Sequence, residues 1–166
     1  MAHTKFKGQL VKLFGEFIQL NDIAPNFHLV RNDLSDYYLD YAKGKNVVLN
    51  IFPSLDTSVC ATSVRHFNKI AAQLPNTVIL AISKDLPFAQ GRFCTTEGID
   101  NVIALSDFRS PEFAQEYGLL MQDGPLRGLL ARAVIVINPE GKVIYTEIVT
   151  EITTEPNYDA VIRLLK

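Results

Sequence analysis

Hydrophobic residues occur along the chain in two kinds of pattern. Short continuous runs, which are typical of strands buried on both faces of a sheet, cover 46–52, 77–83 and 131–137. Apolar residues with helical spacing extend from Cys60 to Leu74, and a second such stretch covers 156–166. The pattern therefore predicts an α/β protein in which strands alternate with helices.

Shorter apolar segments and turn residues predict the remaining elements. They are a hairpin over 5–13 turning at Gly8-Gln9, strands over 24–30 and 101–105, helices over 87–96 and 110–117, a loop over 121–130, and a strand over 142–149 that pairs with 131–137. The segment 34–41 is ambiguous. This order fits a thioredoxin-like fold, with a central mixed β-sheet flanked by helices and an N-terminal β-hairpin. Sites in such sheets lie beyond the carboxyl ends of the parallel strands.

Composition limits the classes of function. The 166 residues are expected to form one domain, residues 1–166, and the net charge of −2 without a Lys/Arg cluster argues against nucleic-acid binding. No apolar run approaches the ~20 residues of a membrane span. The N-terminal residues lack the apolar core of a secretion signal, so we expect a cytoplasmic protein. Three scattered histidines and the lack of a glycine-rich phosphate loop predict neither a metal nor an organic cofactor.

Cys60 is the leading candidate for a reactive group. It falls in the first turn of the helix that follows the strand 46–52, where free N–H groups and the helix dipole stabilise a thiolate. The other cysteine, Cys94, lies on a weak helix between Gly91 and Gly98, so local unfolding would be its route to Cys60. Without a C-x-x-C motif, two buried and inert thiols are the alternative interpretation.

Arg132 is the best candidate for a cation near Cys60. It interrupts the apolar run 131–137, where a charge needs a partner. If this strand is antiparallel to 46–52, its start lies at the same sheet edge as the loop before Cys60. The alternative is an arginine at a strand end that points to water.

Thr57 and Pro53 precede Cys60 in the same loop. Thr57 lies three residues before Cys60, so the two side chains can share a face, and its hydroxyl can orient a substrate oxygen or the sulfur. Alternatively, Thr57 only caps the helix. Pro53 stiffens the loop and can shield the thiolate from water, although a simple strand stop is equally consistent with the sequence.

The spacing Pro53-x-x-x-Thr57-x-x-Cys60 resembles the active-site pattern of peroxiredoxins. The wider sequence is similar to the thiol peroxidase subfamily in several segments, namely Asn50 to Ser54, Asp85-Leu86-Pro87-Phe88-Ala89-Gln90, Arg92-Phe93-Cys94, Asp123 to Leu126, Gly128-Leu129, Ala131 to Val134 and Glu151 to Pro156. The similarity runs from the N-terminal hairpin to the last helix, and the combination with Cys94 makes it specific.

The resemblance implies a peroxidase mechanism. Cys60 would be the peroxidatic cysteine and Cys94 the resolving one, joined in an intrachain disulfide during turnover. Thr57 and Arg132 would bind and polarise the peroxide, and Pro53 would shield the site. The family uses no metal or organic cofactor, is usually a homodimer, is usually reduced by thioredoxin and often favours alkyl hydroperoxides over hydrogen peroxide in antioxidant defence.

Two other hypotheses stay open from the sequence. One is a thioredoxin-like redox-sensing or binding module without peroxide turnover, and the other is a structural domain with inert thiols. Apolar residues between Met121 and Leu130 are the candidate lining of a pocket for alkyl chains.

Overall fold

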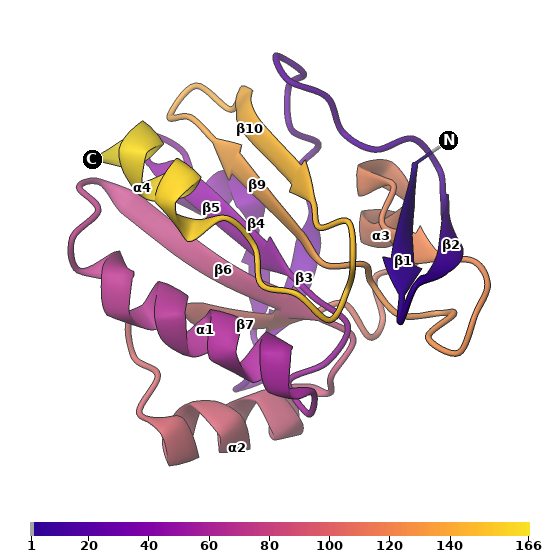
Figure 1. The fold of residues 1–166 in the computed structure, drawn as a ribbon. Coiled ribbons are helices and arrows are strands. Elements are labelled where there is room, and N and C mark those ends of the chain that lie inside the picture. Colours follow the sequence, from indigo (N-terminus) through magenta and orange to yellow (C-terminus); the bar gives the residue numbers. More distant parts are fainter. Residues whose placement is uncertain (1) are drawn as a thin grey trace.

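The computed structural model describes residues 2–166, which form a seven-stranded mixed sheet and a second, three-stranded sheet (Figure 1). In spatial order the large sheet contains β10 (Val143–Ile148), β9 (Ala133–Ile137), β5 (Asn46–Ile51), β6 (Thr77–Ser83), β7 (Ile103–Ser106), β3 (His28–Arg31) and β4 (Asp36–Tyr38). Strands β5, β6 and β7 are parallel, whereas β9 pairs with β5 in the antiparallel direction. The carboxyl ends of the three parallel strands therefore meet at one edge.

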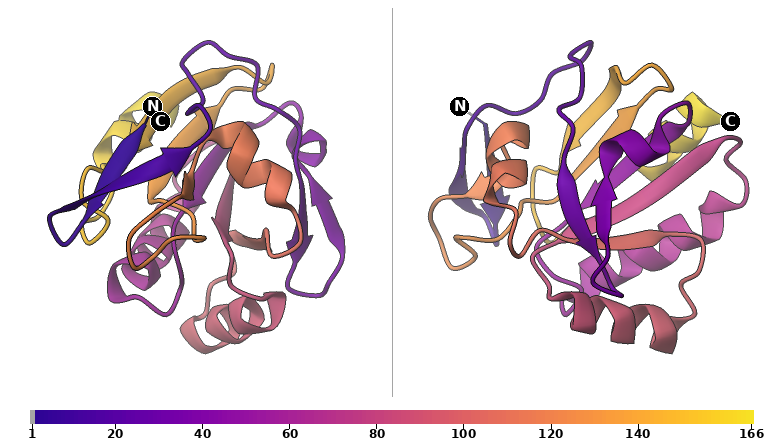
Figure 2. Two further views of the ribbon diagram at one scale, coloured as in Figure 1. Left: turned by 90° about the vertical axis from the view of Figure 1, so that its right-hand side faces the viewer. Right: turned by 180° about the vertical axis from the view of Figure 1, so that it is seen from behind.

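Alternate residues of the central strands enter two different apolar cores. Val48 and Phe52 face the core that also contains α1 (Ser58–Ala71) and α4 (Tyr158–Leu165), while Leu49 and Ile51 face the other core. The helix α2 (Pro87–Glu97) packs on the α1 side, and α3 (Pro111–Tyr117) packs on the opposite side (Figures 1 and 2). Burial on both faces explains why these strands read as continuous apolar runs.

The small sheet consists of β1 (His3–Phe6), β2 (Gln9–Phe14) and β8 (Leu120–Met121). It lies beside the edge at which the parallel strands end (Figure 1). Its hairpin turns at Lys7-Gly8, one residue earlier than predicted, because both residues adopt a positive φ, of 50° and 82°. Two successive positive φ values are the geometry of the tight turns that match strand twist.

The predicted mixed sheet, flanking helices and N-terminal hairpin are confirmed. The ambiguous segment 34–41 contains β4 and the start of the 3-10 helix η1 (Leu39–Ala42), and the predicted strand over 24–30 begins only at His28. The helix carrying Cys94 ends at Gly98, whose φ of 67° terminates it. Across residues 2–166, no helix has the length and hydropathy needed to cross a bilayer.

Candidate active site

Cys60 is the third residue of α1 and lies just beyond the carboxyl end of β5, as the sequence predicted. Its side chain is fully buried and packs in the apolar core between α1 and the sheet. The first-turn position sets the sulfur near the positive end of the helix dipole, which favours a thiolate. Burial in apolar surroundings acts in the opposite sense, so a thiolate needs a further positive partner.

Arg132 supplies that partner. Its side chain is 1% exposed, and its Nη2 donates a hydrogen bond to Cys60 Sγ at 3.0 Å. Ile51, the last residue of β5, pairs with Ala133, the first residue of β9. Arg132, which precedes β9, therefore lies beside the loop that follows β5 and leads to Cys60. The alternative interpretation, an arginine that points to water, is wrong.

Two further features define what the Arg132 guanidinium can do. Its Nε donates to the Ile152 carbonyl at 2.8 Å, whereas its buried Nη1 has no hydrogen-bond partner within the described chain. Over the same residues, no carboxylate lies within salt-bridge distance of Arg132. The Cys60 sulfur is therefore the ionisable group that this buried cation contacts, and one N–H donor is free for another ligand.

Thr57 occupies the N-cap position of α1, but its side chain does not cap the helix. The hydroxyl instead donates to the Ser54 carbonyl at 3.0 Å, so the capping interpretation is wrong. Thr57 is exposed, and Pro53 is buried. Both residues line one cavity together with Arg132.

That cavity has a volume of about 320 Å³ and is mostly apolar. Its other lining residues come from the N-terminal hairpin, the start of α1, the loop after β8 and the segment before α4, and they are Phe6, Ser58, Val59, Leu126, Ile152 and Thr153. Leu126 belongs to the stretch that the sequence suggested for an alkyl pocket. Phe6, Ile152 and Thr153 were missed as site residues, although the segment around Ile152 carried part of the family resemblance.

The hairpin also fixes the carbonyl that holds Arg132. The Ile152 N–H donates to the Lys5 carbonyl at 2.9 Å, which ties this segment to β1. Beside it, the Glu151 carboxylate accepts the Gly8 N–H at 2.8 Å and the Lys7 N–H at 3.1 Å. The bond from Gly8, with others from Thr153 and Lys7, lowers the pKa of Glu151 below its usual value. The orientation of Arg132 thus depends on a hairpin far from it in sequence.

Cys94 lies on α2 as a half-buried free thiol, and no disulfide joins it to Cys60. Burial raises the pKa of Cys94. The helix α2 is attached to α1 by an ion pair at 2.5 Å between Arg65 and Glu97, and Cys94 packs against the same apolar core as Cys60. The structure therefore brings Pro53, Thr57, Cys60 and Arg132 together and leaves Cys94 on a separate helix.

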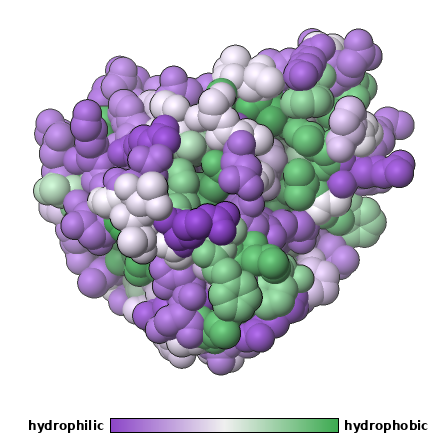
Figure 3. Space-filling model, turned by 90° about the horizontal axis from the view of Figure 1, so that it is seen from below, coloured by the Kyte–Doolittle hydropathy of each residue, from purple (hydrophilic) through white to green (hydrophobic). Residues whose placement is uncertain are grey.

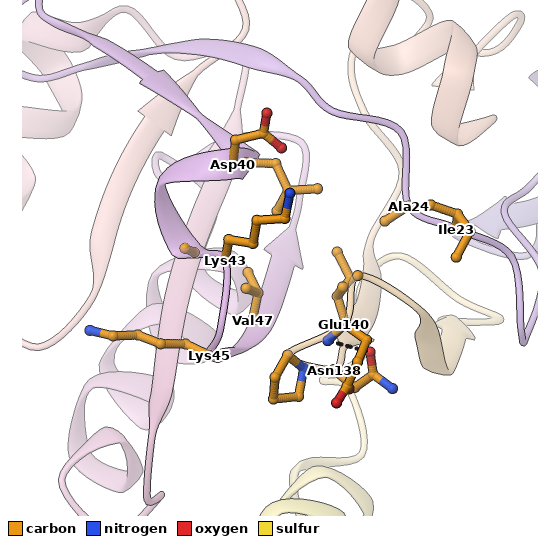
Figure 4. Close-up of a pocket in the computed structure, with 13 residues that line it drawn as sticks. Ile23, Ala24, Asp40, Lys43, Lys45, Val47, Asn138 and Glu140 are labelled. Carbon is orange, nitrogen blue, oxygen red and sulfur yellow. Dashed lines mark hydrogen bonds between the residues drawn. The ribbon is translucent and has the colours of Figure 1, made fainter.

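A second cavity, of about 190 Å³, lies where β5 begins and β9 ends (Figure 4). Its polar side chains include Lys43, Asp40 and Asn138, and the Asn138 side-chain oxygen accepts the Glu140 N–H at 3.1 Å. No cysteine lines it, and no cluster of three potential metal ligands occurs among residues 2–166. The Cys60 sulfur lies beyond the opposite end of β5 from this cavity.

Known proteins share the whole of this architecture. The Redoxin family model matches residues 19–162. The chain is 52% identical over 165 residues to the thiol peroxidase of Corynebacterium glutamicum, covering 99% of each chain. A peroxiredoxin-like protein from Aquifex aeolicus superposes with a TM-score of 0.94 at 42% identity, covering 99% of this chain and 96% of that one. The thiol peroxidase from Chromobacterium violaceum superposes with a TM-score of 0.90 at 23% identity, covering 98% and 94%, a likeness of fold. These superpositions confirm the predicted thioredoxin-like fold.

Proposed function

This chain belongs to the redoxin family and, within it, to the thiol peroxidases, and on that premise we propose that Cys60 is its peroxidatic cysteine and Cys94 its resolving cysteine. The observation that carries the proposal is the buried hydrogen bond from Arg132 to Cys60 Sγ. The chain is an enzyme of the peroxiredoxin type. The alternatives of a binding module without turnover and an inert domain are therefore set aside.

In the first step the Cys60 thiolate attacks the terminal oxygen of a hydroperoxide. A sulfur–oxygen bond forms as the O–O bond breaks, the sulfur is oxidised to sulfenic acid, and the leaving alkoxide takes up a proton and departs as an alcohol. Hydrogen peroxide gives water in the same way. The free Nη1 of Arg132 donates to a peroxide oxygen and stabilises the charge that moves across the O–O bond. The Thr57 hydroxyl, which donates its proton to the Ser54 carbonyl, accepts the O–H of the hydroperoxide, while Pro53 keeps water from the sulfur.

In the second step the Cys94 thiol attacks the sulfenic sulfur of Cys60. The disulfide forms, and the sulfenic oxygen leaves as water. Since burial raises the pKa of Cys94, exposing this thiol as α2 loosens favours the thiolate that attacks. The weak helix between Gly91 and Gly98 supports that movement.

An external dithiol then reduces the disulfide by exchange, and we assign that role to thioredoxin in the cytoplasm, where reducing conditions favour free thiols. We also propose a homodimer. Leu86, Phe88 and Phe108, which follow the carboxyl ends of β6 and β7, are 52%, 67% and 43% exposed and supply apolar surface for a second copy. Figure 3 shows apolar groups gathered in separate patches on the face seen from below.

The apolar lining of the cavity supports a preference for alkyl hydroperoxides over hydrogen peroxide. Phe6, Leu126 and Ile152 offer an alkyl chain a surface that removes it from water, at roughly 25 cal/mol per Å² of apolar area buried. Hydrogen peroxide gains nothing from this contact. Rate constants for cumene hydroperoxide and hydrogen peroxide, compared in the same protein, test the preference.

The decisive experiment maps the oxidation product. Reduced protein receives one equivalent of cumene hydroperoxide and is digested under non-reducing conditions for mass spectrometry. We expect a rapid Cys60–Cys94 disulfide, and in a Cys94→Ser variant a sulfenic acid on Cys60 that dimedone traps. A Cys60→Ser variant serves as the control and forms neither product. Absence of both the disulfide and the trapped sulfenic acid would exclude the proposed roles.

A further inference from the structure

Asp85 lies in the short connection between β6 and α2, and its carboxylate reaches the loop that precedes Cys60. Its Oδ1 accepts the Ser54 hydroxyl at 2.7 Å, and its Oδ2 accepts the Leu55 N–H at 2.8 Å. The Ser83 hydroxyl also donates to Oδ2, at 2.7 Å. Hydrogen bonds to an ionised acceptor are stronger than neutral ones. One half-buried carboxylate thus joins two segments that are 30 residues apart in sequence.

Ser54, which Asp85 holds, also positions Thr57. The Ser54 carbonyl accepts both the Thr57 hydroxyl, at 3.0 Å, and the Thr57 N–H, at 3.2 Å. The Ser54 hydroxyl, while donating to Asp85, accepts the Asp56 N–H at 3.1 Å. Moving Ser54 would therefore move Thr57 and the start of α1 with it.

The backbone of Asp85 is held against β7, whose last residue is Ser106, just before the start of the helix that carries Cys94. The Asp85 carbonyl accepts the Ser106 hydroxyl at 2.5 Å, and α2 begins two residues after Asp85, at Pro87. A groove of about 200 Å³ between the loop and α2 has Asp85, Leu55 and Phe93 in its lining. The far end of α2 is held separately, by the ion pair of Arg65 and Glu97.

Resting on the peroxidase function above, we propose that Asp85 is a positioning residue with opposite effects on the two steps of the cycle. By fixing Ser54 it holds Thr57 in the place that binds peroxide, which favours oxidation of Cys60. By tying the same loop to the base of α2 it opposes the rearrangement that brings Cys94 to Cys60. Its hydrogen bonds must loosen before the disulfide can form.

The test is an Asp85→Asn variant. The substitution removes the negative charge and places an amide N–H group, which is itself a donor, opposite the Ser54 hydroxyl or the Leu55 N–H. Oxidation of Cys60 is timed in a Cys94→Ser background by dimedone trapping, and disulfide formation is timed in the background with both cysteines by acid quench and mass spectrometry. Loss of a charged hydrogen bond should slow oxidation by about tenfold and speed disulfide formation by about tenfold. Rates for both steps that equal those of the parent protein would overturn the proposal.

Ser54→Ala provides a milder variant that deletes one bond to Asp85 and keeps the proposal testable if Asp85→Asn does not fold. We expect the same two directions of change. In the double variant, oxidation should be no slower than in Asp85→Asn alone, because both substitutions remove the same contact. Fully additive losses would contradict the contact.

Arg65→Met is the matched control for general loosening of α2. It removes the ion pair to Glu97 without touching the loop, so it should speed disulfide formation and leave oxidation of Cys60 unchanged. If oxidation slowed as much in Arg65→Met as in Asp85→Asn, positioning by Asp85 would be refuted. A parent protein that formed no sulfenic acid would instead refute the peroxidase function itself, so the two failures are distinguishable.

Discussion

Replacing Arg132 by methionine is the sharpest test of the site. The substitution keeps an unbranched side chain of similar length in a position that is 1% exposed, and it removes the cation that contacts Cys60 Sγ. Methionine is apolar and flexible, so it can fill the buried space that the guanidinium leaves. The Ile152 carbonyl loses its donor, at a cost of about 1–3 kcal/mol, so the variant is expected to fold.

The magnitude follows from the 3.0 Å contact. Two unit charges at that distance interact by roughly 5 kcal/mol at an effective dielectric constant of 20, which is an upper bound because the sulfur is also desolvated. A hydrogen bond to a charged group contributes a net 1.5–3 kcal/mol or so. Since about 1.4 kcal/mol is a factor of ten, the rate at which Cys60 Sγ reacts as a nucleophile should fall by roughly 10- to 150-fold.

Two assays measure that fall. Alkylation of Cys60 by iodoacetamide, followed in a Cys94→Ser background, reports the thiolate fraction, because the thiolate is the nucleophile. Oxidation by cumene hydroperoxide should slow by more than alkylation does, since the variant also lacks the free Nη1 donor. Arg109→Met, which removes an arginine whose side chain is 52% exposed, is the matched control and should leave both rates unchanged.

The reasoning would be refuted by a folded Arg132→Met variant that is alkylated as fast as its parent. Equal slowing of alkylation and of peroxide reduction would have a narrower meaning. It would show that Arg132 acts on the thiolate alone and has no part in binding the peroxide.

Three further predictions concern stability and local order. Burial raises the pKa of Asp107 to about 6, so between about pH 4 and 6 the folded protein holds a proton that the unfolded chain has lost. The free energy of unfolding should therefore fall by about 3 kcal/mol as the pH rises through this range. Urea unfolding should show this slope in the parent and lose it in Asp107→Asn, and an equal slope in both proteins would contradict the assignment. Glu151→Gln weakens the acceptor of the hairpin-turn N–H groups, so hydrogen exchange of those amides should accelerate, and unchanged protection would disprove this role. Gly118→Ala places a Cβ 2.3 Å from backbone atoms at a φ of 70°, so it should lower the free energy of unfolding by roughly 1–3 kcal/mol or more in denaturant titrations. Gly44→Ala, whose Cβ meets nothing within 4 Å, should cost much less. Equal losses in the two variants would exclude the steric explanation.

Local patterns were enough to predict most of the fold and the reactive sulfur. Strands buried on both faces and helices with one apolar face impose different spacings of hydrophobic residues, so 46–52 and the helix from Cys60 could be predicted from neighbouring positions alone. A charge inside the apolar run 131–137 singled out Arg132 for the same reason. The hairpin turn was misplaced by one residue, because nothing in the sequence marks Lys7 as adopting a positive φ.

The sequence by itself determined the α/β architecture, the position of Cys60 at a helix start and the small set of residues near it in the chain. Only the tertiary structure decided that Arg132 contacts the sulfur rather than water, that Phe6 and Ile152 complete the cavity, and that Asp85 holds the loop. These contacts join residues from 30 to more than 100 positions apart. These contacts form only because particular strands lie side by side in a particular register, and the spacing of hydrophobic residues along the chain does not specify that pairing.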